Sequence, residues 1–114
     1  MHISNTVFKP FVHILVVEDN EIDVEAIQRA FRKAAIQSPL HVACDGVEAL
    51  DMLRGQNGKS KLPPPYIILL DINMPRMDGI RLLQELRKSD EDALKQSIVF
   101  MLTTSARSRD RALA

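Results

Sequence analysis

The sequence predicts an α/β fold with a doubly wound parallel sheet, and the distribution of apolar residues is the basis of this prediction. Residues 12–17, 66–70 and 98–102 are short runs made up almost entirely of apolar residues. Such runs, bounded by turn residues, are typical of strands that are buried on both faces of a parallel sheet. Between them, residues 21–35 and 79–88 have the apolar spacing of amphipathic helices. Strands that alternate with helices in this way indicate a parallel sheet with right-handed crossover connections.

Two further segments complete the predicted alternation. Residues 40–44 alternate large apolar with small or polar side chains, which is typical of a strand at the edge of a sheet. Asp45 and Glu48 have the spacing of a helix capping box, so we expect a helix to begin at Asp45. The side chains expected on the inner faces of the helices are Val24, Ile27, Phe31, Ala34, Val47, Leu50, Leu53, Leu82, Leu83 and Leu86.

The other segments are expected to be connections. Residues 55–65 contain two glycines and three consecutive prolines, which predicts a stiffened surface loop without chemistry of its own. Residues 89–97 are expected to be a charged connection, and residues 1–11 an arm that leads into the first strand. A last helix is expected to begin at Ser105. Residues 12–114 are therefore interpreted as one domain.

Length and composition limit the classes of protein. A chain of 114 residues is long enough for one core but leaves no room for a separate effector module. Lysine plus arginine and aspartate plus glutamate number 15 each, so no charge excess indicates binding to nucleic acid or to a membrane surface. The single cysteine, Cys44, cannot form an internal disulfide, and no apolar run approaches the roughly 20 residues that span a bilayer. The expected location is cytoplasmic.

Three carboxylates follow two of the predicted buried strands. Glu18 and Asp19 come directly after the 12–17 strand, and Asp71 comes directly after the 66–70 strand. Neighbouring parallel strands lie about 5 Å apart, so these carboxylates are expected to meet at the carboxyl edge of the sheet. Like charges at this spacing destabilise the fold unless a cation joins them. A magnesium ion, held by carboxylates and water, is the expected cation.

These residues belong to a pattern that resembles the receiver domain of two-component response regulators. The pattern consists of ED at 18–19, DINMPRMDG at 71–79 and TTS at 103–105, and the resemblance runs from about His13 to the end of the sequence. The longer loop before the third strand and the LTTSA ending of the fourth are most similar to the stand-alone regulators that serve phytochrome-type sensor kinases.

The resemblance implies a flavodoxin-like fold with strand order 2-1-3-4-5. The sequence ends at Ala114, before the fifth strand and the last helix of that fold, so the expected domain is truncated. Without a fifth strand, the 98–102 strand would be an apolar edge open to pairing. We expect either a fragment of a longer polypeptide, which we favour, or a homodimer in which a second copy covers this edge.

The resemblance also implies a function in phosphoryl signalling. Asp71 would accept a phosphoryl group from a sensor histidine kinase or a phosphotransfer protein. The implied ligands of Mg²⁺ are Asp71, Asp19, Glu18 less directly, and the main-chain carbonyl of Asn73. The hydroxyl of Thr103 would act as a switch that moves the surface formed by the fourth strand and the following helix. No turnover of small molecules is expected, so the protein would not be an enzyme.

Other functions fit the same residues less well. An EF-hand loop counted from Asp71 requires glycine at its sixth position, where Arg76 stands. A phosphatase of the haloacid dehalogenase type requires a second acid where Asn73 stands. The serious alternative is a pseudo-receiver, a docking or dimerisation module that works without phosphorylation. The observation that favours this alternative is the lack of any lysine beyond Lys95, because the family carries a phosphate-contacting lysine after its fifth strand.

Overall fold

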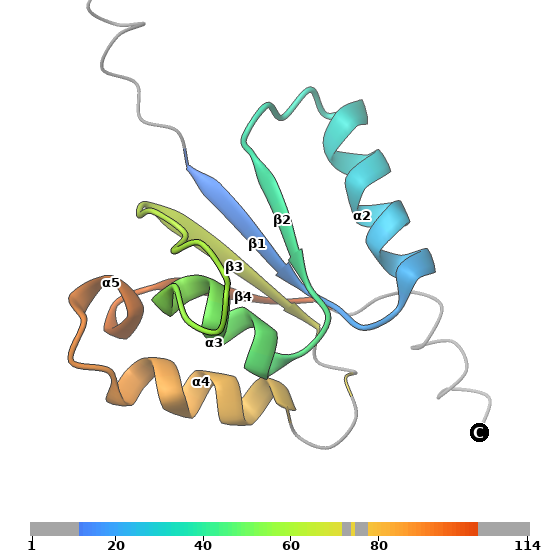
Figure 1. Cartoon of the computed structure of the whole chain (residues 1–114). Coiled ribbons are helices and arrows are strands. Elements are labelled where there is room, and N and C mark those ends of the chain that lie inside the picture. Colours follow the sequence, from blue (N-terminus) through green and yellow to red (C-terminus); the bar gives the residue numbers. More distant parts are fainter. Residues whose placement is uncertain (1–11, 72–73, 75–77, 103–114) are drawn as a thin grey trace, which may run out of the picture.

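The computed structural model describes residues 12–71, 74 and 78–102, and in these residues a four-stranded parallel sheet carries helices on both faces (Figure 1). The order in the sheet is β2-β1-β3-β4. The predicted order of the first four strands and the edge position of β2 are therefore confirmed. The strands are β1, His13–Val17; β2, Leu40–Ala43; β3, Tyr66–Asp71; and β4, Ile98–Leu102.

In the described part of the chain, helices α3, α4 and α5 cover one face of the sheet, and α2 lies over the other (Figure 1). Helix α2, Glu21–Lys33, ends two residues earlier than predicted because Ala35 adopts a positive φ of 57°. The opposite face carries α3, Gly46–Arg54, α4, Asp78–Lys88, and α5, Asp92–Lys95. Helix α5 lies in the segment that we predicted to be only a connection. A single turn is too short to show helical periodicity in the sequence.

The capping box predicted at the start of α3 is present with a small shift. Asp45 is the N-cap residue, and its Oδ1 accepts a hydrogen bond of 2.7 Å from the backbone N–H of Glu48. Glu48 Oε1 in return accepts from the N–H of Cys44, also at 2.7 Å, rather than from Asp45. At the other end, Gly55 adopts a left-handed φ of 70° and terminates the helix.

The main core lies between the sheet and the α3, α4 and α5 layer. The inward face predicted for α3 is wrong at Val47, which is 68% exposed, whereas Ala49 and Leu53 are fully buried. The predicted surface loop 55–65 also contributes to the core, because Leu62 is buried and donates its N–H to the carbonyl of Met52 at 2.8 Å. The core side chains include Leu15, Val17, Ala43, Ala49, Leu53, Leu62, Tyr66, Ile68, Leu70, Met74, Leu82, Leu86 and Leu94.

The face of the sheet that carries α2 is less covered. Its predicted inner residues Val24, Ile27 and Phe31 are half-buried, and Ala34 is exposed, which corrects the expectation that all four face a core. Strand β4 is the most open part of the described sheet. The side chains of Ile98, Phe100 and Met101 are 56%, 53% and 50% exposed.

Several predictions fall on residues that the structure does not describe. The arm at 1–11, the backbone of Asn73, the hydroxyl of Thr103 and the helix expected from Ser105 all lie outside the described ranges. Within those ranges, no helix combines the length and the apolar character needed to cross a membrane.

Candidate functional site

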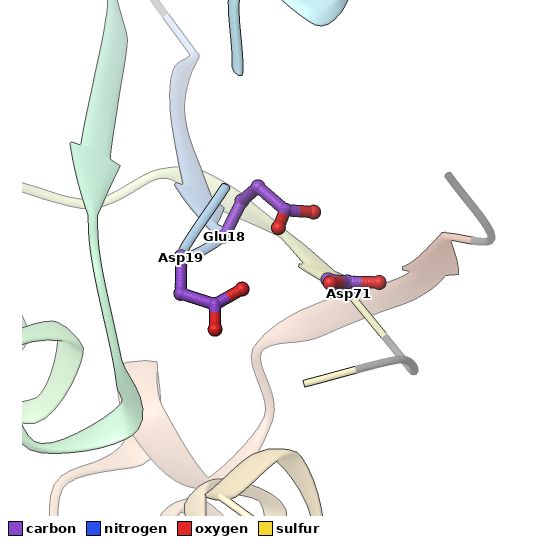
Figure 2. Close-up of side chains that lie close together, drawn as sticks. All are labelled: Glu18, Asp19 and Asp71. Atoms are coloured by element: carbon purple, nitrogen blue, oxygen red, sulfur yellow. The ribbon is translucent and has the colours of Figure 1, made fainter. Parts of the chain in front are cut away.

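Three carboxylates meet at the carboxyl edge of the sheet, where β1 and β3 lie side by side (Figure 2). The pairing of Val17 with Leu70 aligns the two strands so that the residues after them, Glu18 and Asp71, are neighbours. Asp19 follows in the loop that leads to α2. One oxygen atom from each of the three carboxylates lies within 4.8 Å of the other two. The convergence expected from the order of strands and acids is therefore observed.

The three groups differ in their access to solvent. Glu18 and Asp71 are 2% and 1% exposed, whereas Asp19 is exposed. Glu18 Oε1 accepts a hydrogen bond of 3.0 Å from the N–H of Asn20. Its second oxygen, Oε2, is buried and has no hydrogen-bond partner among the described residues. A buried carboxylate oxygen without a donor is costly, so the cluster favours either a proton or a cation at this position.

Asn20 fixes the loop that carries two of the acids, a role that was not predicted from the sequence. Its side-chain Oδ1 accepts from the N–H groups of Ile22 and Asp23, at 2.9 and 3.1 Å, and so caps α2. Its own N–H holds Glu18, as described above. Asn20 therefore couples the start of α2 to the acidic cluster. An asparagine directly before an amphipathic segment was the signal that could have revealed the cap.

Burial and the neighbouring acids change the protonation of Glu18. Burial is the largest cause that raises its pKa, to about 8, and the carboxyl groups of Asp71 and Asp19 raise it further. The hydrogen bond from Asn20 opposes this shift. We therefore expect the metal-free cluster to hold a proton on Glu18 at neutral pH.

We expect the stability of the metal-free protein to fall as the pH rises from 5 to 8. The folded-state pKa of Glu18, about 8, lies above its ordinary value of 4.5, so between these values the folded state binds more protons than the unfolded state. The contribution is fully present below the ordinary pKa and is lost as the pH rises through the folded-state pKa. Urea unfolding at several pH values, with and without Mg²⁺, measures it.

The titration of His41 opposes the effect of Glu18, and two controls separate the two effects. Burial and the charge of His13 lower the pKa of His41, which gives stability that increases as the pH rises through 6.5 and so opposes the Glu18 effect. Glu18→Gln should remove the loss of stability between pH 5 and 8. In the parent protein, Mg²⁺ should restore more of this stability than Na⁺ at equal ionic strength. A profile that is the same in Glu18→Gln and in the parent would contradict the assignment.

The donor set fits a hard divalent cation. Carboxylate oxygens are the ligands that Mg²⁺ and Mn²⁺ prefer, and a cation would compensate the buried Glu18 Oε2. Asp19 lies on the exposed side of the cluster, where water ligands can complete the coordination. The three carboxylates can thus hold a metal ion and present Asp71 beside it.

Met74 and Gly79 belong to the same sequence motif as Asp71 and lie next to the core. Met74 is buried and belongs to the core. Gly79 lies in the first turn of α4 and does not adopt a positive φ. A Cβ on Gly79 would lie 3.4 Å from the side chain of Leu70. This is an ordinary van der Waals distance, so a Cβ would fit between α4 and the end of β3.

Comparison with known proteins identifies the family. The model of the response regulator receiver domain matches residues 14–114. The chain belongs to the response regulator receiver family. Receiver domains act in two-component signalling, and this assignment agrees with the fold and with the position of the acidic cluster at the carboxyl ends of β1 and β3.

Similar proteins include regulators associated with phytochromes. Response regulator Rcp1 of Synechocystis sp. is 36% identical over 92 residues, which are 81% of this chain and 61% of that protein. The bacteriophytochrome response regulator AtBRR has a solved structure with a TM-score of 0.72 and 35% identity, covering 91% of this chain and 74% of that one. The resemblance to phytochrome-associated regulators is therefore confirmed.

Two further structures are similar. A two-component response regulator from Legionella pneumophila is 42% identical with a TM-score of 0.71, covering 89% of this chain and 76% of that one. A crystal structure of Rcp1 is the Mn²⁺-bound form of that protein, with 36% identity, a TM-score of 0.69, and coverage of 89% and 70%. The chain spans about three fifths of the length of its curated relatives Rcp1 and FilR2 of Methanothrix harundinacea.

Proposed function

We propose that this receiver domain accepts a phosphoryl group on Asp71 from a sensor histidine kinase or a phosphotransfer protein. The observation that carries the proposal is the convergence of Glu18, Asp19 and Asp71 within 4.8 Å at the carboxyl edge of the sheet. In the reaction, an Asp71 carboxylate oxygen attacks phosphorus of a phosphohistidine, a P–O bond forms and the P–N bond breaks. The imidazole leaves with the electron pair and takes up a proton.

The proposed cation is Mg²⁺, held by Asp71, Asp19, the main-chain carbonyl of Asn73 and, less directly, Glu18. When bound, the ion would neutralise charge on the phosphoryl oxygens. The Mn²⁺-bound form of Rcp1 supports a divalent ion in a related protein. Burial of Asp71 supports its role as acceptor, because the end of β3 fixes its carboxylate, and positioning supplies most of the catalysis in phosphoryl transfer.

Thr103 is the proposed switch. It follows β4 directly in the sequence, and β4 pairs with β3 so that Leu102 lies beside Asp71. We propose that the hydroxyl of Thr103 reaches a phosphoryl group on Asp71. A hydrogen bond between them would move the β4 surface and so signal to a partner.

The test is phosphorylation by acetyl phosphate, a donor that needs no kinase. The purified protein is incubated with acetyl phosphate with and without Mg²⁺, and intact mass and peptide mapping follow the product. We expect one base-labile phosphoryl group on the peptide that contains Asp71, formed only with Mg²⁺. A protein that binds Mg²⁺ but gains no phosphoryl group would contradict the proposal.

Such a result would favour a second candidate, a docking or dimerisation module that works without phosphorylation. The exposed side chains of Ile98, Phe100 and Met101 on β4 support it, because an open apolar edge strand invites pairing with another chain. We propose a homodimer in which a second copy covers β4. Sedimentation should show a concentration-dependent dimer that Phe100→Glu abolishes, and a parent protein that stays monomeric would contradict this arrangement.

A further inference from the structure

Two histidines lie together on the sheet, at the opposite end of β1 from the acidic cluster. His13 is the first residue of β1, and His41 lies in β2. The Nδ1 atom of His13 is 3.1 Å from the Nε2 atom of His41, and the ring centroids are 5.3 Å apart with planes inclined by 34°. None of the roles proposed above uses either ring.

The register of the sheet explains why the two rings meet. His41 is paired with Leu15, two residues after His13, so the two histidine side chains leave neighbouring strands on the same face. The backbone N–H of His13 donates a hydrogen bond of 3.0 Å to the carbonyl of Pro65. Both rings are half-buried, and the two strands rather than a mobile loop set their separation.

The surroundings leave room for further ligands and carry little uncompensated charge. His41 borders a cavity of about 320 Å³ that Met52 and the 59–63 segment also line. The two lysines of that segment are engaged elsewhere, since Lys59 pairs with Glu48 and Lys61 with Glu91, each at 3.0 Å. Water molecules could therefore complete the coordination of an ion bound by the two rings.

We propose that His13 and His41 form a two-imidazole site for a late divalent transition metal, such as Zn²⁺, Ni²⁺ or Cu²⁺. Metal–nitrogen bonds of about 2.0–2.1 Å would span the observed separation at an N–metal–N angle of about 100°, between square-planar and tetrahedral values. Imidazole nitrogen suits these metals, whereas Mg²⁺ prefers oxygen, so this site and the acidic cluster select different ions.

Binding of the metal moves one hydrogen within a ring, releases no proton and changes no oxidation state. In the metal-free pair, one of the two facing nitrogens carries the hydrogen and the other accepts it. The metal takes the lone pairs of both, and the displaced hydrogen moves to the far nitrogen of its own ring. Both rings remain neutral. Because the paired geometry exists only in the folded chain, the metal stabilises the junction of β1 and β2.

The experiment is a Zn²⁺ titration of the full chain in saturating Mg²⁺, which occupies the acidic cluster. Ring ¹⁵N spectra should show saturation at one equivalent, with Zn²⁺ on His13 Nδ1 and His41 Nε2. His13→Gln and His41→Gln should each weaken binding by at least about tenfold, because loss of a ligand costs no less than loss of a residue that orients one. The melting temperature of the parent should rise with Zn²⁺.

The matched controls are His2→Gln, which removes the remaining histidine, and Cys44→Ser, which removes the exposed thiol. Both should bind Zn²⁺ as the parent does. Thermal melting without metal shows whether each variant is folded. If one of the two histidine variants fails to fold, the other still tests the site. Unchanged affinity in a folded His13→Gln or His41→Gln, or lost affinity in either control, would overturn the two-imidazole site.

Discussion

Asp71→Asn is expected to abolish phosphorylation by acetyl phosphate and, at pH 8 without Mg²⁺, to make the protein more resistant to urea. The amide is a poor nucleophile toward phosphorus, so the acceptor is lost. It is also neutral and nearly the same size as the carboxylate, so it removes a charge next to Glu18 without opening a cavity. The pKa of Glu18 should fall but stay above its ordinary value, because burial is the largest cause of its shift. A gain of about 1 kcal/mol is expected.

The matched control for this substitution is Asp92→Asn. Asp92 is exposed and begins α5, which precedes β4 and therefore lies toward the opposite end of the sheet from the acidic cluster. The control should be phosphorylated like the parent. Mg²⁺ should change the stability of the control and of the parent by the same amount. If Asp71→Asn were still phosphorylated on the same peptide, or if it unfolded more easily than Asp92→Asn at pH 8, the proposed arrangement of charges would be wrong.

Leu53→Ala should cost about 2–5 kcal/mol of stability, a large part of the roughly 5–15 kcal/mol that holds a domain of this size together. Leu53 is fully buried in α3 and belongs to the main core with Leu15 and Ile68. Its truncation removes apolar contacts and leaves a cavity between the helix and the sheet. Urea unfolding should show a lower midpoint with little change in slope.

Val47→Ala in the same helix provides the comparison. Val47 is 68% exposed, so its truncation should change stability by less than about 0.5 kcal/mol. The sequence pattern placed Val47 and Leu53 on the same inner face, and the structure does not. Equal costs for the two substitutions would support the pattern and contradict the orientation of α3 described here.

The positions of the strands and of the three acids could be predicted because each depends on local sequence. An apolar run between turn residues indicates a buried strand, and an acid after each run must lie at the carboxyl edge of a parallel sheet. Glu18, Asp19 and Asp71 met as expected for this reason. The pKa of Glu18 and the bond from Asn20 could not be predicted in the same way, because they depend on how β1 and β3 pack and on where α2 begins.

The errors also have physical causes. In α3 the small residue Ala49 is buried, whereas the inner face was predicted from large apolar side chains. Val47 was therefore placed on that face by mistake. Leu62 fills the core from within a segment whose glycines and prolines indicated only a loop. The meeting of His13 and His41 depends on the register between β1 and β2, which the sequence does not specify directly.

Calorimetric titration with Mg²⁺ at pH 7, in two buffers of different ionisation enthalpy, tests most directly whether the three carboxylates share one site. If Glu18 holds a proton in the metal-free cluster and loses it to the buffer when the ion binds, one Mg²⁺ should bind with release of about one proton, and the observed heat should differ between the buffers. The same titration of Glu18→Gln should release no proton. Heat that is identical in both buffers, or no saturable binding of Mg²⁺ by the parent protein, would contradict the account.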